Sequence, residues 1–330
     1  MQIVLGVDGG GTKTAAVVMD AAQRVLGRGI GPSSNHHDVG ATAATAALRQ
    51  AIEQALSEAG ADFADVVGIC LCLAGVDRPA DRELITGLVR AIYPFPRIVI
   101  YNDAVGALAA GTGRLLGVVV IAGTGTIAYG FDRHGRSARA AGWGALLADY
   151  GSGFWIGMEA LHAIVRAADG RGPATALTER VLAGLRLAKV EDLISWTYGE
   201  PFHWHRFAAL APMVTEAAQA GDAMAQDILR RAGCHLAESG LAVVRRLQMQ
   251  GEPFDLVLSG SVWQAGEWVL ASFREVVLAE APQARILFPS RTAAEGAALL
   301  AWKEAWHGRS GNESMVDRGA PSCLDGSGPA

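Results

Sequence analysis

The stretch Ile3-Val4-Leu5-Gly6-Val7-Asp8-Gly9-Gly10-Gly11-Thr12-Lys13-Thr14 joins a short apolar run to a glycine-rich turn, and a second apolar run follows over 14–19. Such runs, bounded by glycine, predict two strands joined by a turn. Glycine lets backbone N–H groups approach a polyphosphate because no Cβ atom blocks them. The stretch matches neither a Walker A loop nor a dinucleotide-binding fingerprint. A purely structural hairpin and a phosphate-binding loop both remain open.

The second half of the sequence opens with the same pattern. An apolar run over 118–122 leads into Gly123-Thr124-Gly125-Thr126, and another apolar run follows over 127–131. The polar turn over 132–136 then matches the one over 20–24. This repetition favours a duplicated domain core. Two matching glycine-rich loops are typical of a pair that clamps one polyphosphate.

Strand and helix signals alternate along most of the chain, which predicts an α/β fold. The further strands are expected at 25–30, 66–73, 97–102, 254–259 and 284–288. The helices are expected at 41–59, 81–92, 104–110, 222–251, 269–278 and 293–306. We expect two domains, 1–115 and 116–306. The glycine-, serine- and proline-rich tail over 307–330 has no apolar period and is expected to be disordered.

The composition limits the classes of function. The chain has 330 residues, of which 51% are hydrophobic and 18% charged, and its formal net charge is −5. No dense basic run is present, which argues against nucleic-acid and membrane-surface binding. No signal peptide and no apolar stretch of about 18–20 residues occur, so we expect a cytoplasmic protein. The four cysteines (Cys70, Cys72, Cys234 and Cys323) are expected to be structural thiols.

Three polar segments carry candidate chemistry. Asp103 follows a buried strand as a helix begins, so it is either an N-cap or a general base. The loop over 141–153 suits either a sugar site or a connection in which Ser152 caps the next helix. The segment over 33–37 is a polar turn, or a substrate-facing loop if Asn35 points inward. Its two histidines, His36 and His37, lack partner acids at metal-ligand spacing, so no metal site is expected there.

Seven of these segments, in this order, resemble the N-acetylglucosamine and glucosamine kinases of the BadF/BadG/BcrA/BcrD ATPase family, within the actin–hexokinase–Hsp70 superfamily. They are Asp8–Thr12, Ser34-Asn35-His36, Asn102-Asp103-Ala104, Gly123-Thr124-Gly125, Gly142-Trp143-Gly144, Asp149–Ser152 and Gly260-Ser261-Val262-Trp263. The resemblance covers about residues 3–300. It implies two actin-like, ribonuclease H-like domains with ATP and sugar in an interdomain cleft.

The resemblance also implies roles for individual residues. The ATP-binding residues would be Gly9, Gly10, Gly11, Thr12, Lys13, Gly123, Thr124, Gly125, Ala208, Gly260 and Ser261. The sugar would contact Asn35, Asp103, Trp143, Gly144 and Asp149. Asp103 would be the base for the sugar 6-hydroxyl, so the resemblance favours the general base over the N-cap. Asp8, at the end of the first strand, would hold Mg²⁺ through water.

Two departures bear on the substrate. Tyr150 stands where many kinases of this kind have a second acid, and Ile127 stands where eukaryotic members have an asparagine. The expected acceptor is glucosamine or N-acetylglucosamine, and both a monomer and a homodimer fit the sequence. One alternative is an ATPase activator of a reductase, whose [4Fe–4S] cluster needs thiolates that this chain does not supply in a suitable pair. A sugar-sensing regulator would need a DNA-binding module, which the sequence does not show.

Overall fold

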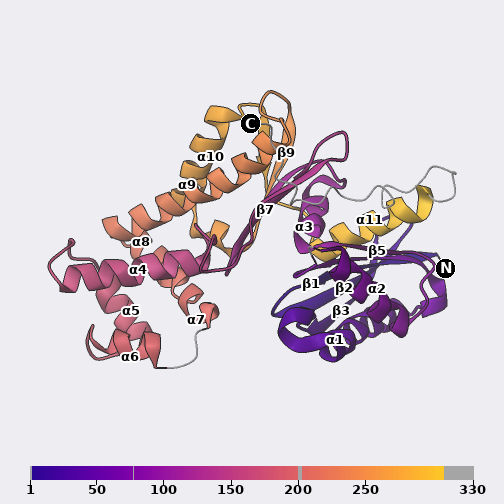
Figure 1. The fold of residues 1–330 in the computed structure, drawn as a ribbon, viewed down its shortest axis with the longest axis horizontal. Coiled ribbons are helices and arrows are strands. Elements are labelled where there is room, and N and C mark those ends of the chain that lie inside the picture. The colour runs from indigo at the N-terminus through magenta and orange to yellow at the C-terminus, as the bar shows by residue number, and fades with distance from the viewer. Residues whose placement is uncertain (1, 77, 200–202, 308–330) are drawn as a thin grey trace. The chain divides into compact units, whose positions relative to one another are not determined.

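The computed structural model describes residues 2–76, 78–199 and 203–307 and contains two compact units (Figure 1). The first consists of the chain up to Gly117, Gly130–Ala138 and the chain from Leu287. The second consists of Val118–Tyr129 and Arg139–Ile286. None of the helices in the described ranges combines the length and apolar character needed to span a bilayer. All but the first residue of the expected tail, 307–330, lies outside the described residues.

The first unit is built on a five-stranded sheet in the order β3-β2-β1-β4-β5. Its strands are β1 (Ile3–Gly9), β2 (Lys13–Asp20), β3 (Val25–Pro32), β4 (Val66–Leu73) and β5 (Ile98–Asn102). Its helices are α1 (His36–Ala59), α2 (Pro79–Ile92), α3 (Asp103–Thr112) and α11 (Ala293–His307), with a 3-10 turn at Phe63–Asp65. The first three strands are antiparallel, whereas β1, β4 and β5 run parallel.

Helices α1 and α2 cover one face of this sheet with an apolar core. Alternate residues of a strand point to opposite faces, and Val7 and Leu71 point to this one. They pack with Leu48 and Ile52 of α1 and with Ile85 of α2, all of them fully buried. The same alternation that buries these side chains sends Asp8 to the opposite face.

Glycine allows α1 to pack closely on β3. Gly27, Gly29 and Gly31 alternate along β3, and each lies against backbone atoms of α1. At Gly29 an added Cβ atom would overlap the carbonyl oxygen of Ala51. The helix presents alanine at the facing positions, so backbone packs directly on backbone here.

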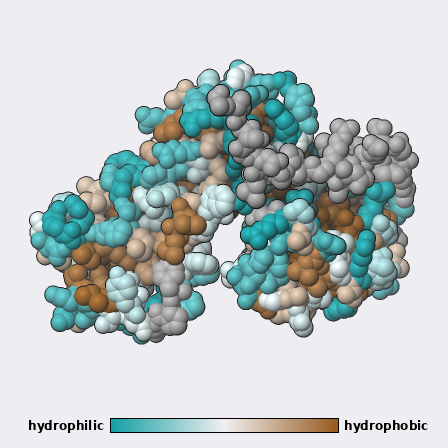
Figure 2. Space-filling model, viewed as in Figure 1, coloured by the Kyte–Doolittle hydropathy of each residue, from teal (hydrophilic) through white to brown (hydrophobic). Residues whose placement is uncertain are grey.

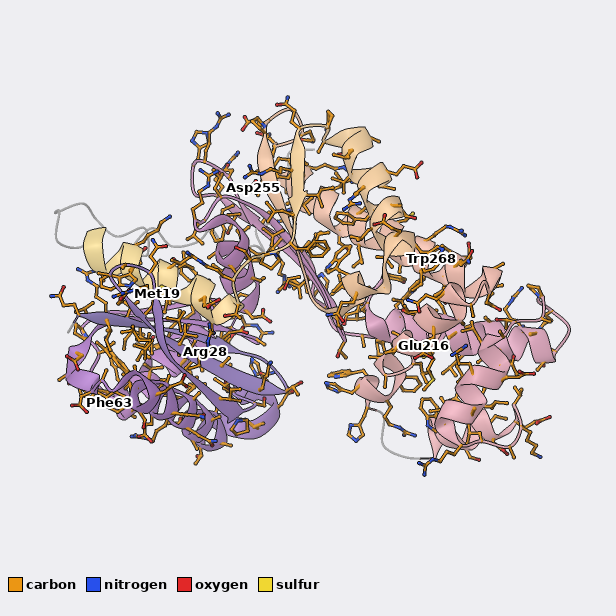
Figure 3. All side chains as sticks on the ribbon, turned by 180° about the vertical axis from the view of Figure 1, so that it is seen from behind. Met19, Arg28, Phe63, Glu216, Asp255 and Trp268 are labelled. Atoms are coloured by element: carbon orange, nitrogen blue, oxygen red, sulfur yellow. The ribbon has the colours of Figure 1, made fainter. Side chains whose placement is uncertain are left out.

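Helix α11 packs on the other face, against β1, β4 and α3 (Figure 1). Gly6 of β1 provides the close approach, because an added Cβ atom would overlap Ala294 and Ala298. Arg28 of β3, labelled in Figure 3, pairs with Glu295 of α11, with a distance of 2.6 Å between Nη2 and Oε1. The expected second domain, 116–306, includes this helix. The structure instead packs it in the first unit, because its apolar and small residues cover β1.

The second sheet has the order β10-β9-β6-β7-β8. Its strands are β6 (Gly117–Ala122), β7 (Thr126–Phe131), β8 (Ser137–Ala141), β9 (Phe254–Ser259) and β10 (Ala284–Leu287). The helices that follow are α4 (Gly153–Ala168), α5 (Leu177–Leu185), α6 (Asp192–Tyr198), α7 (Trp204–Ala208), α8 (Ala211–Gln219), α9 (Ala223–Arg246) and α10 (Glu267–Glu280), with a 3-10 turn at Ser261–Ala265. Asp255 of β9 (Figure 3) pairs with Arg285 of β10, with 2.6 Å between Oδ1 and Nη2.

The two sheets share one strand order, and their polar turns share one set of hydrogen bonds. In the first turn Arg24 donates its backbone N–H to Asp20 Oδ1 at 2.9 Å and its Nε to Oδ2 at 2.8 Å. In the second turn Arg136 donates in the same way to Asp132, at 2.9 and 2.6 Å. The predicted duplication is therefore confirmed, down to this carboxylate–guanidinium turn.

The α/β class is confirmed, and most element boundaries fall near their predicted positions. Helix α1 begins at His36 rather than 41, because Asn35 caps it. The helix is kinked at Gly40, whose φ of 78° and ψ of 163° are not helical. Strand β8, at the edge of the second sheet, was not predicted. The predicted helix over 222–251 ends at Arg246.

The glycine stripe of β3 gives a stability prediction. Gly29→Ala places a methyl group against Ala51, and overpacking of this kind typically costs about 1–3 kcal/mol in free energy of unfolding. Gly87→Ala is the matched control, because Gly87 lies inside α2 with open space around its Cβ position. It should stabilise the protein by about 0.5–1 kcal/mol. Urea unfolding of both variants checks this, and equal shifts for the two would contradict the packing.

Candidate active site

The carboxyl ends of β1, β4 and β5 bring two predicted site segments to one edge of the first sheet. The register pairs Gly9 with Leu73 and Leu73 with Asn102, so the three strands end in one row. Asp8 lies one residue before the end of β1, and Asp103 follows β5. Neighbouring strands lie about 4.8 Å apart, which puts these two strand ends roughly 10 Å from each other.

Asp8 and Asp103 both lie near Cys72, which sits between them in β4. A hydrogen bond with Cys70 and burial raise the pKa of the Cys72 thiol, and the charges of Asp8 and Asp103 raise it further. Burial also raises the pKa of Asp8 from 3.8 to about 6, and the nearby Lys13 opposes this shift. A carboxylate held in so apolar a place is stabilised by any cation that reaches it.

Asp103 is the first residue of α3, and Asn102 is the N-cap. The Asn102 Oδ1 atom accepts a hydrogen bond from the Ala104 backbone N–H at 3.0 Å. Asp103 Oδ1 accepts from the same N–H at 2.9 Å. The capping role that Asp103 could have filled therefore belongs to Asn102. Asp103 itself is partly exposed at the edge of the sheet.

The first glycine-rich loop is a tight turn between β1 and β2. Gly10 donates its backbone N–H to the Lys13 carbonyl at 2.9 Å, and the side chains of Thr12 and Lys13 are exposed. Ser33 donates its hydroxyl to the Gly10 carbonyl at 3.1 Å, which ties this turn to the loop before α1. Ser33 lies in the predicted polar segment over 33–37 but was not among the predicted site residues.

Asn35 is both the predicted sugar residue and the N-cap of α1. Its Oδ1 accepts from the His37 backbone N–H at 3.3 Å, and its Nδ2 donates to Asp38 Oδ2 at 2.6 Å. Asp38 therefore fixes the orientation of the Asn35 amide. Asp38 was not predicted as a site residue, although an acid three residues after an N-cap is a recognisable capping pattern.

The second glycine-rich loop is held by the start of α4. Gly123 donates its backbone N–H to the Gly125 carbonyl at 2.9 Å. The Gly153 and Phe154 N–H groups donate to the Gly123 and Thr124 carbonyls at 2.7 and 3.2 Å. Ser152 caps α4, as the local alternative predicted, by accepting from the Trp155 N–H at 3.2 Å.

Asp149 lies beneath this second loop. A Cβ atom added to Gly125 would be 2.7 Å from Asp149 Oδ2, so the carboxylate lies directly against the loop backbone. Burial raises the pKa of Asp149, and a hydrogen bond from the Thr126 backbone N–H opposes the rise. The acid is nearly fully buried, at 8% exposure. The structure thus joins a predicted sugar residue to a predicted phosphate loop.

Gly142, Trp143 and Gly144 form an exposed bend beside β7. Gly142 and Gly144 have φ values of 70° and 89°, and the Trp143 side chain is 61% exposed. The Arg139 guanidinium lies over the Trp143 ring, 5.0 Å from its centroid. Ile127 packs beneath the bend, because a Cβ atom added to Gly142 would be 3.1 Å from its Cδ1.

The predicted adenosine positions lie at the same end of the second sheet as the second loop. Strands β6 and β9 are parallel, with Ile121 paired to Ser259, so Gly260 and Ser261 follow β9 just as Gly123 follows β6. Ala208, at the end of α7, is near Gly153 at the start of α4. The structure therefore groups the predicted residues of each unit at the end of its own sheet.

A groove of about 950 Å³ lies within the second unit, among α4, α6 and α9. Hydrophobic residues gather on the visible face over α4 and α5 (Figure 2). Ile194 and Tyr198, which line the groove, are 65% and 82% exposed. None of the predicted site residues contributes to it. The groove is therefore separate from the candidate active site.

Three comparisons with known proteins agree with one another. The chain is 39% identical over 311 residues to an N-acetyl-D-glucosamine kinase of Dictyostelium discoideum, with 91% of this chain and 98% of that protein covered. It is 33% identical over 304 residues to an N-acetylmuramic acid/N-acetylglucosamine kinase of Clostridium acetobutylicum, with 92% and 99% covered. A solved structure from Chromobacterium violaceum, named provisionally as an N-acetylglucosamine kinase, has a TM-score of 0.74 at 28% identity, with 91% and 99% covered.

The fold and the family predicted from the sequence are both confirmed. The likeness to the Chromobacterium structure extends over both units and agrees with the predicted actin-like architecture. The model of one protein family matches residues 5–301, nearly all of the described chain. The chain therefore belongs to the BadF/BadG/BcrA/BcrD ATPase family.

Proposed function

We propose that this protein is an ATP-dependent kinase that phosphorylates glucosamine or N-acetylglucosamine on the 6-hydroxyl. One observation carries the proposal: Asp8, one residue before the end of β1, and Asp103, directly after β5, lie at the carboxyl ends of two parallel strands of one sheet, beside a glycine-rich turn. Phosphoryl transfer needs a phosphate-binding backbone, a cation site and a base for the attacking hydroxyl within reach of one another. The Dictyostelium and Clostridium relatives, both named as amino-sugar kinases, support this choice of substrate.

In this proposal the two glycine-rich loops bind the ATP phosphates. The phosphate-binding residues of the first unit would be Gly9, Gly10, Gly11, Thr12 and Lys13. Those of the second unit would be Gly123, Thr124 and Gly125. Support comes from the hydrogen bonds that fix each turn and from the exposed Lys13 and Thr12 side chains. Ala208, Gly260 and Ser261 would contact the adenosine, since they lie at the same sheet end as the second loop.

Asp8 would hold the Mg²⁺ that accompanies ATP, through water. The fit rests on the place of Asp8 beside the glycine-rich turn and on its partial burial, which raises its pKa: a partly desolvated carboxylate gains from a nearby dication. Carboxylate and water oxygens are also the ligands that Mg²⁺ prefers. When bound, the ion would offset negative charge on the phosphates. Lys13 already supplies one positive charge to the same acid.

Asp103 would accept the proton of the sugar hydroxyl. Since Asn102 caps α3, the Asp103 carboxylate is not required for that purpose. Its place at the start of the helix puts it near the positive end of the helix dipole, which favours the ionised form that a base needs. A base at the end of a buried strand is also held in one position, and fixed geometry is what general-base catalysis requires.

Asn35, Trp143, Gly144 and Asp149 would bind the sugar. Asn35 has an amide already oriented by Asp38, and Trp143 offers an exposed ring for the apolar face of a sugar. Asp149 is the least accessible of the four, so its role would combine sugar binding with support of the loop at Gly125. Ile127 packs under Gly142 and offers no polar group for the 2-substituent. We therefore expect the 2-position to be read loosely.

The alternative of an ATPase activator is not favoured. Cys70 and Cys72 are both fully buried in β4. The pKa of the Cys72 thiol is raised, chiefly by its hydrogen bond with Cys70 and by burial. An iron–sulfur cluster needs accessible thiolates. Neither sulfur meets that requirement.

Asp103→Asn should leave folding and ATP binding intact and lower turnover by roughly 10²–10⁴-fold, the usual effect of removing a general base. Asp192→Asn is the matched control, since Asp192 is likewise the first residue of a helix, α6. A coupled assay of ADP release in the presence of N-acetylglucosamine measures both. Near-normal turnover by Asp103→Asn would overturn the assignment.

Asp8→Asn should stabilise the protein in a pH-dependent manner. The folded-state pKa of about 6 exceeds the ordinary value of 3.8. Below pH 3.8 Asp8 is neutral in both the folded and the unfolded chain, so the protein keeps its full stability. As pH rises from 3.8 to 6 the unfolded chain ionises first, and the free energy of unfolding falls. At pH 7 the variant should be more stable by about 3 kcal/mol, and at pH 4 the difference should nearly vanish. Urea unfolding at the two pH values checks this. The same difference at both would show that Asp8 ionises normally.

The choice of sugar is tested with a panel of hexoses. Glucosamine and N-acetylglucosamine should differ by less than about 150-fold in kcat/KM, or roughly 3 kcal/mol, because Ile127 makes no hydrogen bond that one of them would lack. Glucose should react more slowly than both. A higher kcat/KM for glucose would contradict the amino-sugar assignment. ATP hydrolysis without phosphorylation of any hexose would favour the ATPase alternative.

A further inference from the structure

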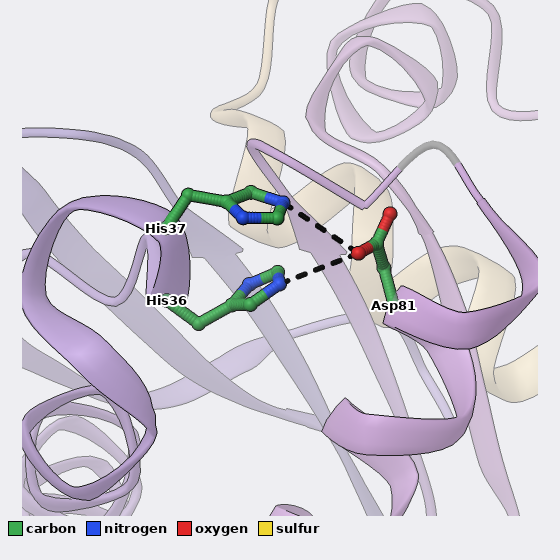
Figure 4. A group of neighbouring side chains, drawn as sticks. All are labelled: His36, His37 and Asp81. Atoms are coloured by element: carbon green, nitrogen blue, oxygen red, sulfur yellow. Dashed lines mark ion pairs between the residues drawn. The ribbon is translucent and has the colours of Figure 1, made fainter.

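Three side chains that the proposed function does not use converge at one point of the first unit. His36 and His37 open α1, and Asp81 lies in the first turn of α2 (Figure 4). Each histidine has its Nε2 atom 3.5 Å from Asp81 Oδ1. The three potential ligand atoms all lie within 4.8 Å of one another.

His36 is a buried imidazole in need of a partner. Its side chain is 6% exposed, and among the residues that the structure describes neither ring nitrogen makes a hydrogen bond. Leaving a buried polar group without a hydrogen-bond partner destabilises the folded state. Its Nε2 points toward the Asp81 carboxylate (Figure 4). A ligand placed between these two groups would satisfy both.

Asp81 is held in position by its other carboxylate oxygen. Oδ2 accepts a hydrogen bond from the Arg78 backbone N–H at 3.0 Å, at the start of α2. Oδ1 consequently faces the two imidazoles. The Asp81 side chain is nearly buried, at 11% exposure.

His37 forms the open side of the cluster. Its side chain is 51% exposed, and its ring lies 4.0 Å from that of His36, centroid to centroid. Its Nε2 is also 3.1 Å from the Gly75 carbonyl oxygen. A metal ion at Nε2 would replace this contact, and the ring would keep its proton on Nδ1. The exposed side leaves room for a water molecule as a further ligand.

We propose that His36, His37 and Asp81 bind one divalent transition-metal ion, with Zn²⁺ as the preferred class. Two imidazoles and one carboxylate are a usual three-ligand set for zinc, with water in the fourth position. Tetrahedral ligands at the usual bond lengths lie about 3.3 Å apart, close to the two observed separations of 3.5 Å. Mg²⁺ prefers oxygen ligands and would bind poorly here.

The ion would join the N-terminal ends of α1 and α2, two helices whose sequence segments are far apart. Asn35 immediately precedes the two histidines and caps α1. A metal at this place would therefore restrain the loop that carries Asn35. The effect on sugar binding depends on the proposed function, whereas metal binding itself does not.

The experiment is a titration of tag-free, nucleotide-free full-length protein with Co²⁺ and Zn²⁺. Tetrahedral Co²⁺ gives visible absorption, and Zn²⁺ should displace it. One ion per chain should bind, and His37→Gln and Asp81→Asn should each weaken binding by at least about 100-fold, since even indirect ligand support is worth 10–100-fold. His134→Gln, an exposed histidine in the turn over 132–136, is the control and should bind as the unmodified protein does.

Melting curves without metal guard against misfolded variants. His37→Gln is the decisive variant, because its half-exposed ring can be replaced without opening the core. Zinc should raise the melting temperature of the unmodified protein and of His134→Gln, and not that of folded His37→Gln. Absence of visible absorption with Co²⁺, or equal affinity in His37→Gln, would overturn the proposal. Neither readout involves sugar or ATP, so the kinase assignment is tested separately.

Discussion

The parallel pairing of β4 with β1 and with β5 is the constraint on which the first unit depends. Main-chain hydrogen bonds fix the register at Gly9, Leu73 and Asn102, and the strand ends therefore coincide. A slip of one residue would turn Asp8 into the apolar core under α1, and would turn Val7 out of it. The same ladder that forms the core thus decides where the carboxylates lie. Chemistry is confined to the strand ends because the faces of the sheet are already covered by helices.

At this edge of the sheet, the placement of acids that suits function lowers the stability of the fold. Asp8 sits where burial disfavours its charge, and the fold tolerates this because the apolar contacts of β1 outweigh it. Asp149 is in a similar position beneath the second loop, where a backbone N–H from Thr126 offsets part of the burial. Buried acids with raised pKa values are common at functional sites, because a bound cation or substrate can stabilise their charged form. The duplicated Asp–Arg turns show the contrary case, since there each carboxylate has its guanidinium within the fold.

Local patterns in the sequence were sufficient to predict much of the fold and part of the candidate site. Apolar runs, glycine-rich turns and the repeat of 20–24 at 132–136 predicted the strands, the duplication and the Ser152 cap, because each depends on neighbours in the chain. Two features depended on distant residues and could not be found in that way. Helix α11 packed on β1 rather than in the second unit, and α2 brought Asp81 to His36 and His37. The cap at Asn102 is local, but Asn102 and Asp103 are both capping residues and the sequence does not choose between them. A short edge strand such as β8 carries too weak an apolar pattern to predict.

The packing of α11 on the first sheet affects how the chain folds during synthesis. Gly6, near the start of the chain, is covered by Ala294 and Ala298 near the end of the described residues. During synthesis the strands of the first sheet emerge well before α11, and the face that α11 covers stays uncovered until α11 leaves the ribosome. At typical elongation rates that interval is on the order of ten seconds or more. The second unit, whose residues are nearly continuous, can be completed meanwhile. This face of the first sheet is therefore exposed for longer during synthesis than the face that α1 and α2 cover.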